Sequence, residues 1–318
     1  MPSEFDLIAK YFTRPARRAV LGVGDDAALL AVQPGCELAV SADMLVEGVH
    51  FFPDVDAQAL GHKALAVNLS DMAAMGAMPR WALLALALPR VDATWLDAFS
   101  HGFFALADKH GVDLVGGDTT RGPLALCVQI LGEVERGKAL RRDGARAGDD
   151  IWVSGELGAA AAAIAHRRGE LVLAPQALQR CRERLDRPAP RVALGLELAG
   201  LASSAIDVSD GLLADLGHVC ERSHVGARVS REAVPCAADL QALRGQPAVE
   251  RAVLAGGDDY ELCFTAAPEH AGEIAALGAG LELALTRIGA IVEGGAVALV
   301  DAAGRELAVE EAGFDHFR

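Results

Sequence analysis

The segment from Gln58 to Gly76 constrains the fold more than any other part of the sequence. It is rich in Ala, Leu and Met, and it predicts a long helix that is apolar on nearly every side. Such a helix has to be buried under other elements. It also contains Asp71, which shares a face with Asn68, and a buried carboxylate is costly unless it is paired or bound to a metal ion. The segment therefore predicts either a hydrogen-bonded buried aspartate or a metal ligand that faces a cleft.

The rest of the chain mixes strands and helices without regular alternation, which predicts α+β domains rather than a doubly wound sheet. Helices are predicted at 3–12, 92–110, 157–168, 175–186, 190–201 and 268–279. Strands are predicted at 37–41, 80–88, 112–115, 124–134, 151–154 and 260–265. A length of 318 residues favours two domains. The polar, glycine-containing stretch 136–150 marks the boundary, so we expect domains at 1–137 and 148–318.

Charge and composition exclude several classes of protein. The 29 basic and 44 acidic residues give a net charge of −15, and the absence of a basic run argues against a nucleic-acid partner. The six cysteines form no C-x-x-C pair, so they are expected to be small buried side chains in a reducing compartment. The N-terminal residues do not resemble a signal peptide, and the longest apolar runs are too short to span a bilayer. We therefore expect a cytoplasmic protein with no membrane partner.

Aspartates in the first half of the chain occur in short motifs with glycine. Asp25 and Asp26 lie in Gly-Val-Gly-Asp-Asp-Ala-Ala, which is either a simple turn or a site where cations offset the two like charges. The motif is neither a phosphate-binding Walker loop nor a dinucleotide fingerprint. Asp43 and Asp118 are predicted at the ends of strands, where side chains project into loops. Gly117, before Asp118, would let the backbone approach a phosphate closely, although a polar turn is the alternative.

Two further motifs lie in the second half. Ser209 or Asp210 can cap the helix predicted to begin at Gly211. A cap does not require Asp207 as well, so the three side chains together form a credible cation and phosphate site. The sequence Gly-Gly-Asp-Asp-Tyr-Glu from 256 to 261 then places three acids directly before an apolar strand.

The aspartates are more informative together than singly. None is spaced with His or Cys as in a zinc site, and oxygen ligands favour a hard cation such as magnesium. Magnesium takes one or two carboxylates and completes its shell with water and phosphate oxygens, so several aspartates imply several ions and a polyphosphate. The set therefore predicts magnesium-dependent phosphoryl transfer. Its members are Asp26, Asp43, Asp71, Asp118, Asp207 and Asp210.

Six motifs occur in an order that resembles the thiamine-monophosphate kinase family across essentially the whole chain. They are Gly-Asp-Asp-Ala-Ala (24–28), Ser-Ala-Asp-Met-Leu-Val-Glu-Gly-Val-His-Phe (41–51), Asn-Leu-Ser-Asp-Met-Ala-Ala-Met-Gly (68–76), Gly-Gly-Asp-Thr-Thr-Arg-Gly (116–122), Ile-Asp-Val-Ser-Asp-Gly (206–211) and Gly-Gly-Asp-Asp-Tyr-Glu-Leu (256–262). The final Gly-Phe-Asp-His-Phe (313–317) is similar as well. The resemblance implies ATP-dependent conversion of thiamine monophosphate to thiamine diphosphate. It also implies the two-domain AIR-synthetase-like (PurM-like) α+β fold, an N-terminal domain that pairs in a homodimer, and an active site in the cleft where the domains meet.

The resemblance also implies a role for individual residues, with no catalytic group beyond the metal cluster. The magnesium positions are Asp26, Ser41, Ala42, Asp43, Asp71, Asp118, Asp207 and Asp210. The ATP positions are Gly117, Asp118, Arg142, Ser209 and His110. The thiamine monophosphate positions are His50, Asp258 and Phe314. Three positions depart from the family pattern, because Ala42 replaces a usual Thr, Asp258 a usual Glu, and His110 is expected where a Tyr usually touches the nucleotide.

The expected mechanism is direct in-line transfer. The attacking oxygen of a phosphate monoester is already anionic at neutral pH, so no general base is required. Repulsion between anions is then the main barrier, and cations offset it. Alternative functions are a phosphoribosylformylglycinamidine cyclo-ligase, a selenophosphate synthetase, a non-catalytic sensor of nucleotide or thiamine phosphate, and a structural protein. The absence of a Cys before Cys36 disfavours the synthetase, and the residues 313–317 favour the kinase over both related enzymes.

Overall fold

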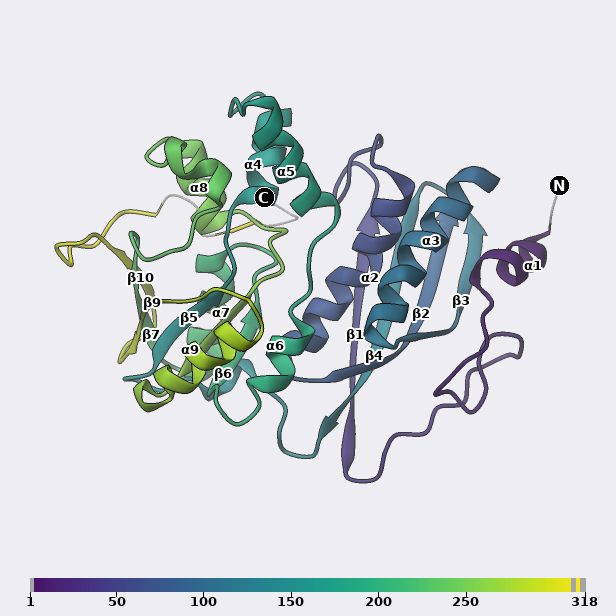
Figure 1. The fold of residues 1–318 in the computed structure, drawn as a ribbon, viewed down its shortest axis with the longest axis horizontal. Helices are drawn as coiled ribbons and strands as arrows, with labels where there is room; N and C mark the ends of the chain where they lie inside the picture. Colours follow the sequence, from purple (N-terminus) through teal and green to yellow (C-terminus); the bar gives the residue numbers. More distant parts are fainter. Residues whose placement is uncertain (1–2, 310–312, 315–318) are drawn as a thin grey trace. The chain divides into compact units, whose positions relative to one another are not determined.

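The computed structural model describes residues 3–309, 313 and 314 (Figure 1). The chain divides into two compact units, and each is described by itself. Unit 1 comprises 1–72 and 77–137, and unit 2 comprises 73–76 and 138–318. Of the C-terminal motif, Gly313 and Phe314 are described, while 315–317 lie outside the described residues.

Unit 1 is a four-stranded sheet with two helices on one face (Figure 1). The strand order is β1-β4-β2-β3, with β2 and β3 parallel and the other pairs antiparallel. The strands are β1 (Cys36–Val46), β2 (Met78–Leu88), β3 (Asp113–Arg121) and β4 (Ala125–Glu135). The helices are α1 (Glu4–Leu7), continued by the π-helix η1 (Ile8–Phe12), and then α2 (Ala57–Ala74) and α3 (Ala93–His110).

The predicted buried helix is confirmed as α2, and its position depends on two glycines. A Cβ atom on Gly61 would lie 2.0 Å from the carbonyl oxygen of Phe99. A Cβ atom on Gly102 would lie 1.9 Å from the carbonyl oxygen of Gln58. The backbones of α2 and α3 therefore touch directly, and no larger residue fits at either position without moving a helix.

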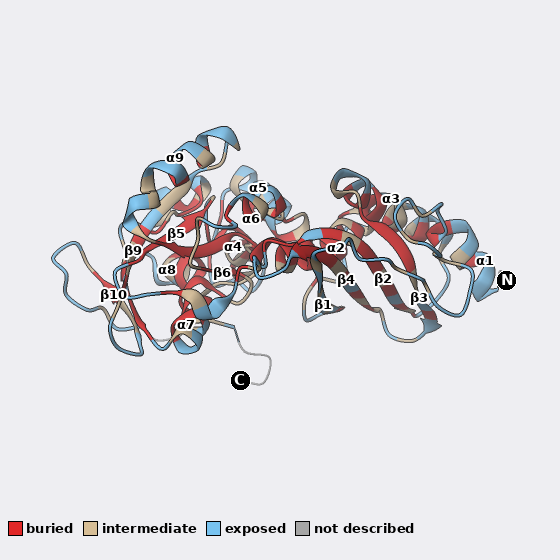
Figure 2. Cartoon of the chain, turned by 90° about the horizontal axis from the view of Figure 1, so that it is seen from below, coloured by how far each residue is buried: buried red, intermediate tan, exposed pale blue. Residues whose placement is uncertain are grey.

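The opposite face of this sheet carries exposed apolar side chains. Leu38, Val40 and Met44 alternate along β1 and are 43%, 61% and 60% exposed. Alternation places them on one face of the sheet. Figure 2 shows α2 of unit 1 largely buried and α1 largely exposed. We call Leu38, Val40 and Met44 the open face of unit 1.

Unit 2 is a six-stranded sheet in the order β10-β7-β9-β5-β8-β6. Its strands are β5 (Asp150–Ser154), β6 (Ser204–Asp207), β7 (Gly226–Ser230), β8 (Leu262–Ala266), β9 (Leu285–Val292) and β10 (Val297–Val300). Its α-helices are α4 (Ala159–Arg167), α5 (Pro175–Asp186), α6 (Val192–Glu197), α7 (Leu212–Ser223), α8 (Pro247–Ala255) and α9 (Ala271–Gly280). Short 3-10 helices are η2 (Arg142–Gly144), η3 (Ala238–Leu243) and η4 (Pro268–His270). Every residue of β5 and β8 is buried, so other elements cover both faces at the centre of the sheet.

The α+β fold class predicted from the sequence is confirmed. Four cysteines are buried as predicted, but Cys36 and Cys127 are partly exposed on the sheet of unit 1, so that prediction is wrong for these two. Across residues 3–309, 313 and 314, no helix combines the length and the apolar character needed to span a bilayer.

Candidate functional site

Ser41 and Asp71 come together in unit 1. The Ser41 hydroxyl donates a hydrogen bond to Oδ2 of Asp71 over 2.6 Å. Ser41 pairs with Ile130, which is fully buried, so the Ser41 side chain faces the helix layer where α2 carries Asp71. Asp71 is therefore hydrogen-bonded, as in one of the two predicted alternatives, but it is partly rather than fully buried. The pair also fits a hard cation, because adjacent oxygens around magnesium lie roughly 3 Å apart when its bonds are about 2.1 Å long.

Asp43 and Asp118 lie inside strands, so the prediction that they end strands is wrong. β1 continues past Asp43 to Val46 because its pairing with β4 continues, and β3 continues past Asp118 to Arg121 along β2. Asp43 is two residues from Ser41, so both side chains face the helix layer. Asp118 is exposed. Pairing partners decide where a strand ends, and neither motif reveals them locally.

Gly117 is a position that needs glycine because of packing inside the sheet, while its predicted approach to a phosphate stays a prediction. Its φ is 142°, and a Cβ atom there would lie 1.9 Å from the carbonyl oxygen of Leu84 on β2. The close neighbour is thus a strand of the same sheet. Two other predicted positions of unit 1 are exposed: Ala42 on β1, and Asp26, whose backbone N–H donates to Oδ1 of Asp25 over 2.9 Å. Asp25 therefore stabilises the local turn.

His50 lies in the turn after β1, and its ring is oriented by a backbone hydrogen bond. The N–H of Val46 donates to Nδ1 of His50 over 3.0 Å. Because Nδ1 accepts, the neutral ring carries its proton on Nε2 and can donate from there. Lys63, which is 1% exposed, donates from Nζ to the backbone oxygen of His50 over 3.2 Å. Sequence reasoning missed Lys63, although a lysine inside an otherwise apolar helix is a visible signal.

His110 is the last residue of α3, and it is partly buried. Its Nε2 atom is buried without a hydrogen-bond partner among the residues that the structure describes. The pKa of His110 is lowered to about 4, chiefly by burial and then by the nearby Lys109 and His62. The ring is therefore neutral near pH 7, which suits contact with an uncharged base.

The second group of candidate residues lies in unit 2, in the loop between β6 and α7. Asp207 ends β6 and is 4% exposed, while Ser209 and Asp210 are partly buried. Oδ2 of Asp215, in the first turn of α7, accepts the backbone N–H groups of Ser209, Asp210 and Gly211, each over 3.1 Å. The prediction that Ser209 or Asp210 caps the helix is therefore wrong, because Gly211 is the N-cap and the carboxylate comes from within α7.

Asp215 was not predicted from the sequence. An acidic residue in the first turn of a helix is a common, weak signal. The pKa of Asp215 is raised to about 7, chiefly because the group is buried and then because Asp207 and Asp210 add like charge; the N–H groups of Asp210 and Gly211 oppose the shift.

The candidate substrate residues attach to the same loop. The N–H of Asp258 donates to the carbonyl oxygen of Ser209 over 2.9 Å, and the N–H of Phe314 donates to that of Asp210 over 2.9 Å. Asp258 and Tyr260 both have positive φ, 67° and 52°, which is uncommon for residues with a side chain. The Tyr260 hydroxyl donates to Oδ1 of Asp258 over 2.9 Å. The strained segment thus holds the Asp258 carboxylate in one orientation.

The other two acids of that motif have structural partners. Asp259 accepts the N–H of Gly158, with both carboxylate oxygens within 3.1 Å of it, and burial raises its pKa well above the usual range. Glu261, which is 3% exposed, forms an ion pair with Arg191 and accepts the Ser154 hydroxyl over 2.6 Å.

Arg142 lies in η2 and is exposed. Its backbone oxygen accepts the hydroxyl of Ser223, at the end of α7, over 2.7 Å. The neighbouring Arg141 and Asp143 pair with each other over 2.6 Å. Arg142 is therefore held by its backbone, and its guanidinium is left at the surface.

The candidate residues form two groups, one in each unit. Unit 1 holds Asp26, Ser41, Ala42, Asp43, His50, Asp71, His110, Gly117 and Asp118, and unit 2 holds Arg142, Asp207, Ser209, Asp210, Asp258 and Phe314. Among the described residues, no three His, Cys, Asp or Glu side chains converge as a complete metal site. Pairs of oxygen donors are what magnesium needs from a protein when phosphates and water supply the rest, so the donor chemistry fits this ion.

Comparison with known proteins places the chain in a family. Residues 24–134 match the AIR synthase related protein family, N-terminal domain, and 146–302 match its C-terminal domain. Thiamine-monophosphate kinase of Escherichia coli (strain K12) is 44% identical, with 99% of this chain and 98% of the relative covered.

Two solved structures agree with this assignment. The crystal structure of thiamine-monophosphate kinase from Stenotrophomonas maltophilia K279a is 49% identical with a TM-score of 0.85, covering 96% of this chain and 95% of that one. A structure described as AaThiL complexed with AMPPCP and TMP is 31% identical with a TM-score of 0.79, covering 90% and 89%. The chain therefore belongs to the thiamine-monophosphate kinase family and has its two-domain AIR-synthetase-like α+β fold.

Proposed function

We propose that this chain transfers the γ-phosphoryl group of ATP to thiamine monophosphate, giving ADP and thiamine diphosphate. The names of its relatives support this reaction, as does the related structure that binds AMPPCP, an ATP analogue, together with TMP. The observation that carries the proposal is the loop between β6 and α7. There, directly after Asp207, the carbonyl oxygens of Ser209 and Asp210 accept the backbone N–H groups of the candidate substrate residues Asp258 and Phe314.

We propose roles for the two groups as follows. Magnesium, when bound, neutralises charge on the phosphates; the residues that would hold it are Asp26, Ser41, Ala42 through its backbone, Asp43, Asp71, Asp118, Asp207 and Asp210. ATP would contact Gly117, Asp118, Arg142, Ser209 and His110. Thiamine monophosphate would contact His50, Asp258 and Phe314. Nε2–H of His50 can donate to a phosphate oxygen, the Asp258 carboxylate can accept from an aminopyrimidine, and the half-exposed Phe314 ring can stack on a thiamine ring.

The chemical step that we propose is an in-line displacement. A phosphate oxygen of thiamine monophosphate forms a bond to the γ-phosphorus, and the bond from that phosphorus to the β–γ bridging oxygen breaks, releasing ADP. The nucleophile is anionic near pH 7, so no side chain has to remove a proton. The Nε2–H group of His50 would orient this oxygen. The task of the chain is thus positioning and charge neutralisation.

A direct assay tests the proposal. Purified chain, magnesium, ATP and thiamine monophosphate should yield ADP and thiamine diphosphate in equal amounts, and a chelator should stop the reaction. Asp71→Asn should lower kcat at least about a hundredfold, on the order of the loss from removing one stabilising group. Asp92→Asn is the matched control, because Asp92 caps α3 through the N–H groups of Thr94 and Trp95 and Asn caps equally well.

The outcomes separate this proposal from its rivals. Full activity of folded Asp71→Asn would contradict the proposed metal role. Binding of thiamine monophosphate without any product would favour a sensor. Neither binding nor product would favour a related ATP-dependent enzyme of the same fold.

We further propose that the chain is a cytoplasmic homodimer with domains at 1–137 and 148–318, paired through the N-terminal one. The open face supports the pairing, because Leu38, Val40 and Met44 gather apolar surface on one strand of a sheet. Pairing two such faces would remove that surface from water.

A further inference from the structure

Every backbone polar group from Val208 to Gly211 has a partner. On one side, the N–H groups of Ser209, Asp210 and Gly211 all donate to a single oxygen, Oδ2 of Asp215. On the other side, the carbonyl oxygens of Val208, Ser209 and Asp210 accept the N–H groups of Tyr260, Asp258 and Phe314, over 2.8, 2.9 and 2.9 Å. The N–H groups of the loop thus bind Asp215, and its carbonyl groups bind the segment that contains Asp258 and the residue Phe314.

We propose that Asp215 is a positioning residue that fixes this loop and thereby couples binding of the nucleotide and its magnesium to binding of thiamine monophosphate. The inference rests on the proposed function. That proposal assigns magnesium and ATP to Asp207, Ser209 and Asp210, and it assigns thiamine monophosphate to Asp258 and Phe314. Asp215 itself touches no substrate in this account. It acts through the backbone that carries the binding residues.

The shape of the loop explains why one carboxylate suffices. Gly211 has a φ of 125°, which only glycine adopts readily, and a Cβ atom there would lie 2.6 Å from the backbone carbon of Ala255. This conformation lets three successive N–H groups converge on one point, as in the anion-binding nests of other proteins. Without the carboxylate, three converging donors would lack an acceptor. The loop would then relax toward other conformations.

An ordinary role in helix stability does not account for this arrangement. A carboxylate in the first turn that only caps its helix accepts the N–H group of the N-cap residue, here Gly211, whereas Asp215 also accepts those of Ser209 and Asp210, which precede the cap.

The coupling follows from the shared backbone. A movement of the loop that displaces Asp210 also displaces the carbonyl groups on which Asp258 and Phe314 depend. A ligand that orders one side therefore lowers the entropic cost of ordering the other, and this effect is reciprocal in binding free energy. Thiamine monophosphate should bind more tightly once Mg²⁺·AMPPCP is present.

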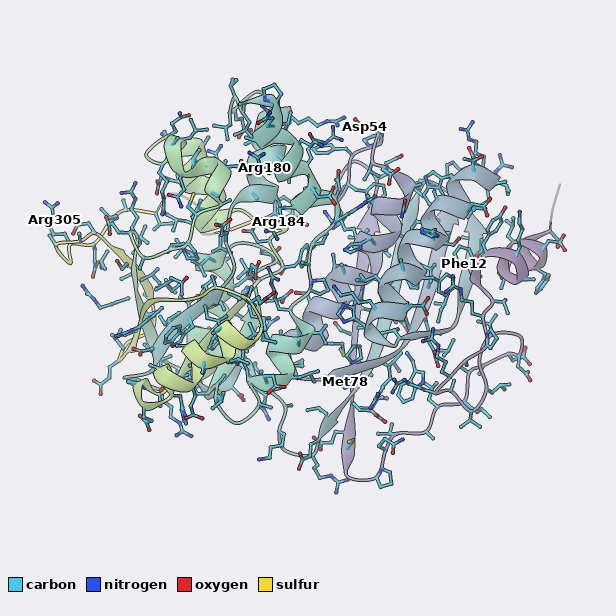
Figure 3. The ribbon with its side chains drawn as sticks, viewed as in Figure 1. Phe12, Asp54, Met78, Arg180, Arg184 and Arg305 are labelled. Atoms are coloured by element: carbon cyan, nitrogen blue, oxygen red, sulfur yellow. The ribbon has the colours of Figure 1, made fainter. Side chains whose placement is uncertain are left out.

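The test compares Asp215→Ala, which removes the acceptor, with Asp215→Asn, which keeps a carbonyl oxygen in its place. The matched control is Asp301→Ala. Asp301 also accepts two backbone N–H groups, from Ala303 and Arg305, and pairs with the Arg305 side chain in a turn of unit 2 that contains no candidate residue. Arg305 is labelled in Figure 3. Calorimetry measures the Kd of thiamine monophosphate with and without Mg²⁺·AMPPCP. Hydrogen exchange measures the protection of the amides of 208–211 and 258–260 in the full-length chain without ligand.

We expect Asp215→Ala to raise the Kd of thiamine monophosphate at least about tenfold, to abolish its tightening by Mg²⁺·AMPPCP, and to speed exchange in both segments. The Kd of thiamine monophosphate for Asp215→Asn should stay within about threefold of the value for the original chain. Asp301→Ala should match the original chain in both Kd and hydrogen exchange. Folded Asp215→Ala with unchanged Kd and unchanged coupling would overturn the proposal.

Two further outcomes are decisive. If Asp215→Ala does not fold, the original chain carries the test: Mg²⁺·AMPPCP must slow exchange in 258–260 as well as in 208–211, and protection confined to 208–211 would overturn the coupling. A chain that binds neither ligand would refute the proposed function. The role of Asp215 is tested separately by hydrogen exchange without ligand, and unprotected amides at 209–211 would overturn it.

Discussion

Arg191→Met tests the ion pair that anchors the candidate substrate segment. The Arg191 side chain is 18% exposed and that of Glu261 is 4% exposed. Nε of Arg191 donates to Oε2 of Glu261 over 2.6 Å, Nη2 donates to Oε1, and the Ser154 hydroxyl donates to Oε2 over 2.6 Å. The substitution keeps much of the side-chain volume and removes two of these three donors.

The expected loss follows from the burial of Glu261. A carboxylate that loses its partner inside a protein keeps its desolvation cost, so breaking a buried pair typically costs about 3 to 5 kcal/mol. Ser154 remains as a donor, which places the expectation at about 3 kcal/mol in the free energy of unfolding. Arg191→Met combined with Glu261→Gln should recover about 2 kcal/mol, because the neutral amide still accepts from Ser154 and leaves no buried charge.

Native-state hydrogen exchange of the β8 amides is the suitable assay, since it reports the stability of unit 2 without assuming that the whole chain unfolds in one step. Asp301→Ala is again a control in the same unit. A loss below about 1 kcal/mol for the single variant would refute the reasoning. So would a double variant no more stable than Arg191→Met.

Three shorter predictions concern the site, pH and assembly. Tyr260→Phe removes the hydrogen bond to Asp258 and should raise the KM for thiamine monophosphate about three- to tenfold with little change in kcat; an unchanged KM would argue against orientation by Tyr260. The pKa of His110 is lowered from 6.5 to about 4 in the folded chain. As the pH falls from about 6.5 to about 4, His110 is therefore protonated in the unfolded chain before it is protonated in the folded one, and the free energy of unfolding should decrease. The decrease should reach up to about 2 kcal/mol after allowance for partial exposure. His110→Gln should remove that part of the pH dependence in thermal unfolding, and an identical profile would contradict it. Val40→Glu on the open face should convert a dimer to a monomer in light scattering, whereas a monomeric original chain would contradict the proposed pairing.

Local patterns were sufficient for the parts of the fold that depend on one segment. The apolar character of 58–76 predicted α2, and the helix predicted at 92–110 is α3, which Gly111 ends with a φ of 66°. The strand ends near Asp43 and Asp118 were wrong because they depend on pairing with β4 and β2, which no local pattern encodes.

The candidate site shows the same division. Asp71 was noticed because a carboxylate contrasts with an apolar helix. Asp215 was missed because its surroundings in the sequence are ordinary, and its importance arises only when the preceding loop folds back onto it. The strained backbone of Asp258 and Tyr260 could not be predicted either, since neither residue type favours positive φ as glycine does.

The close backbone contacts of α2 and α3 at Gly61 and Gly102 have a consequence for evolution and for laboratory selection. Asp71 lies about 15 Å farther along α2 than Gly61, and α2 cannot slide or turn while the two backbones touch. In a library selected only for turnover, both glycines should therefore be as intolerant of replacement as residues that meet the substrate. Exposed neighbours such as His101 should accept many side chains. The measured tolerance to substitution should therefore be as low at the contact of α2 with α3 as at the residues that bind the substrate.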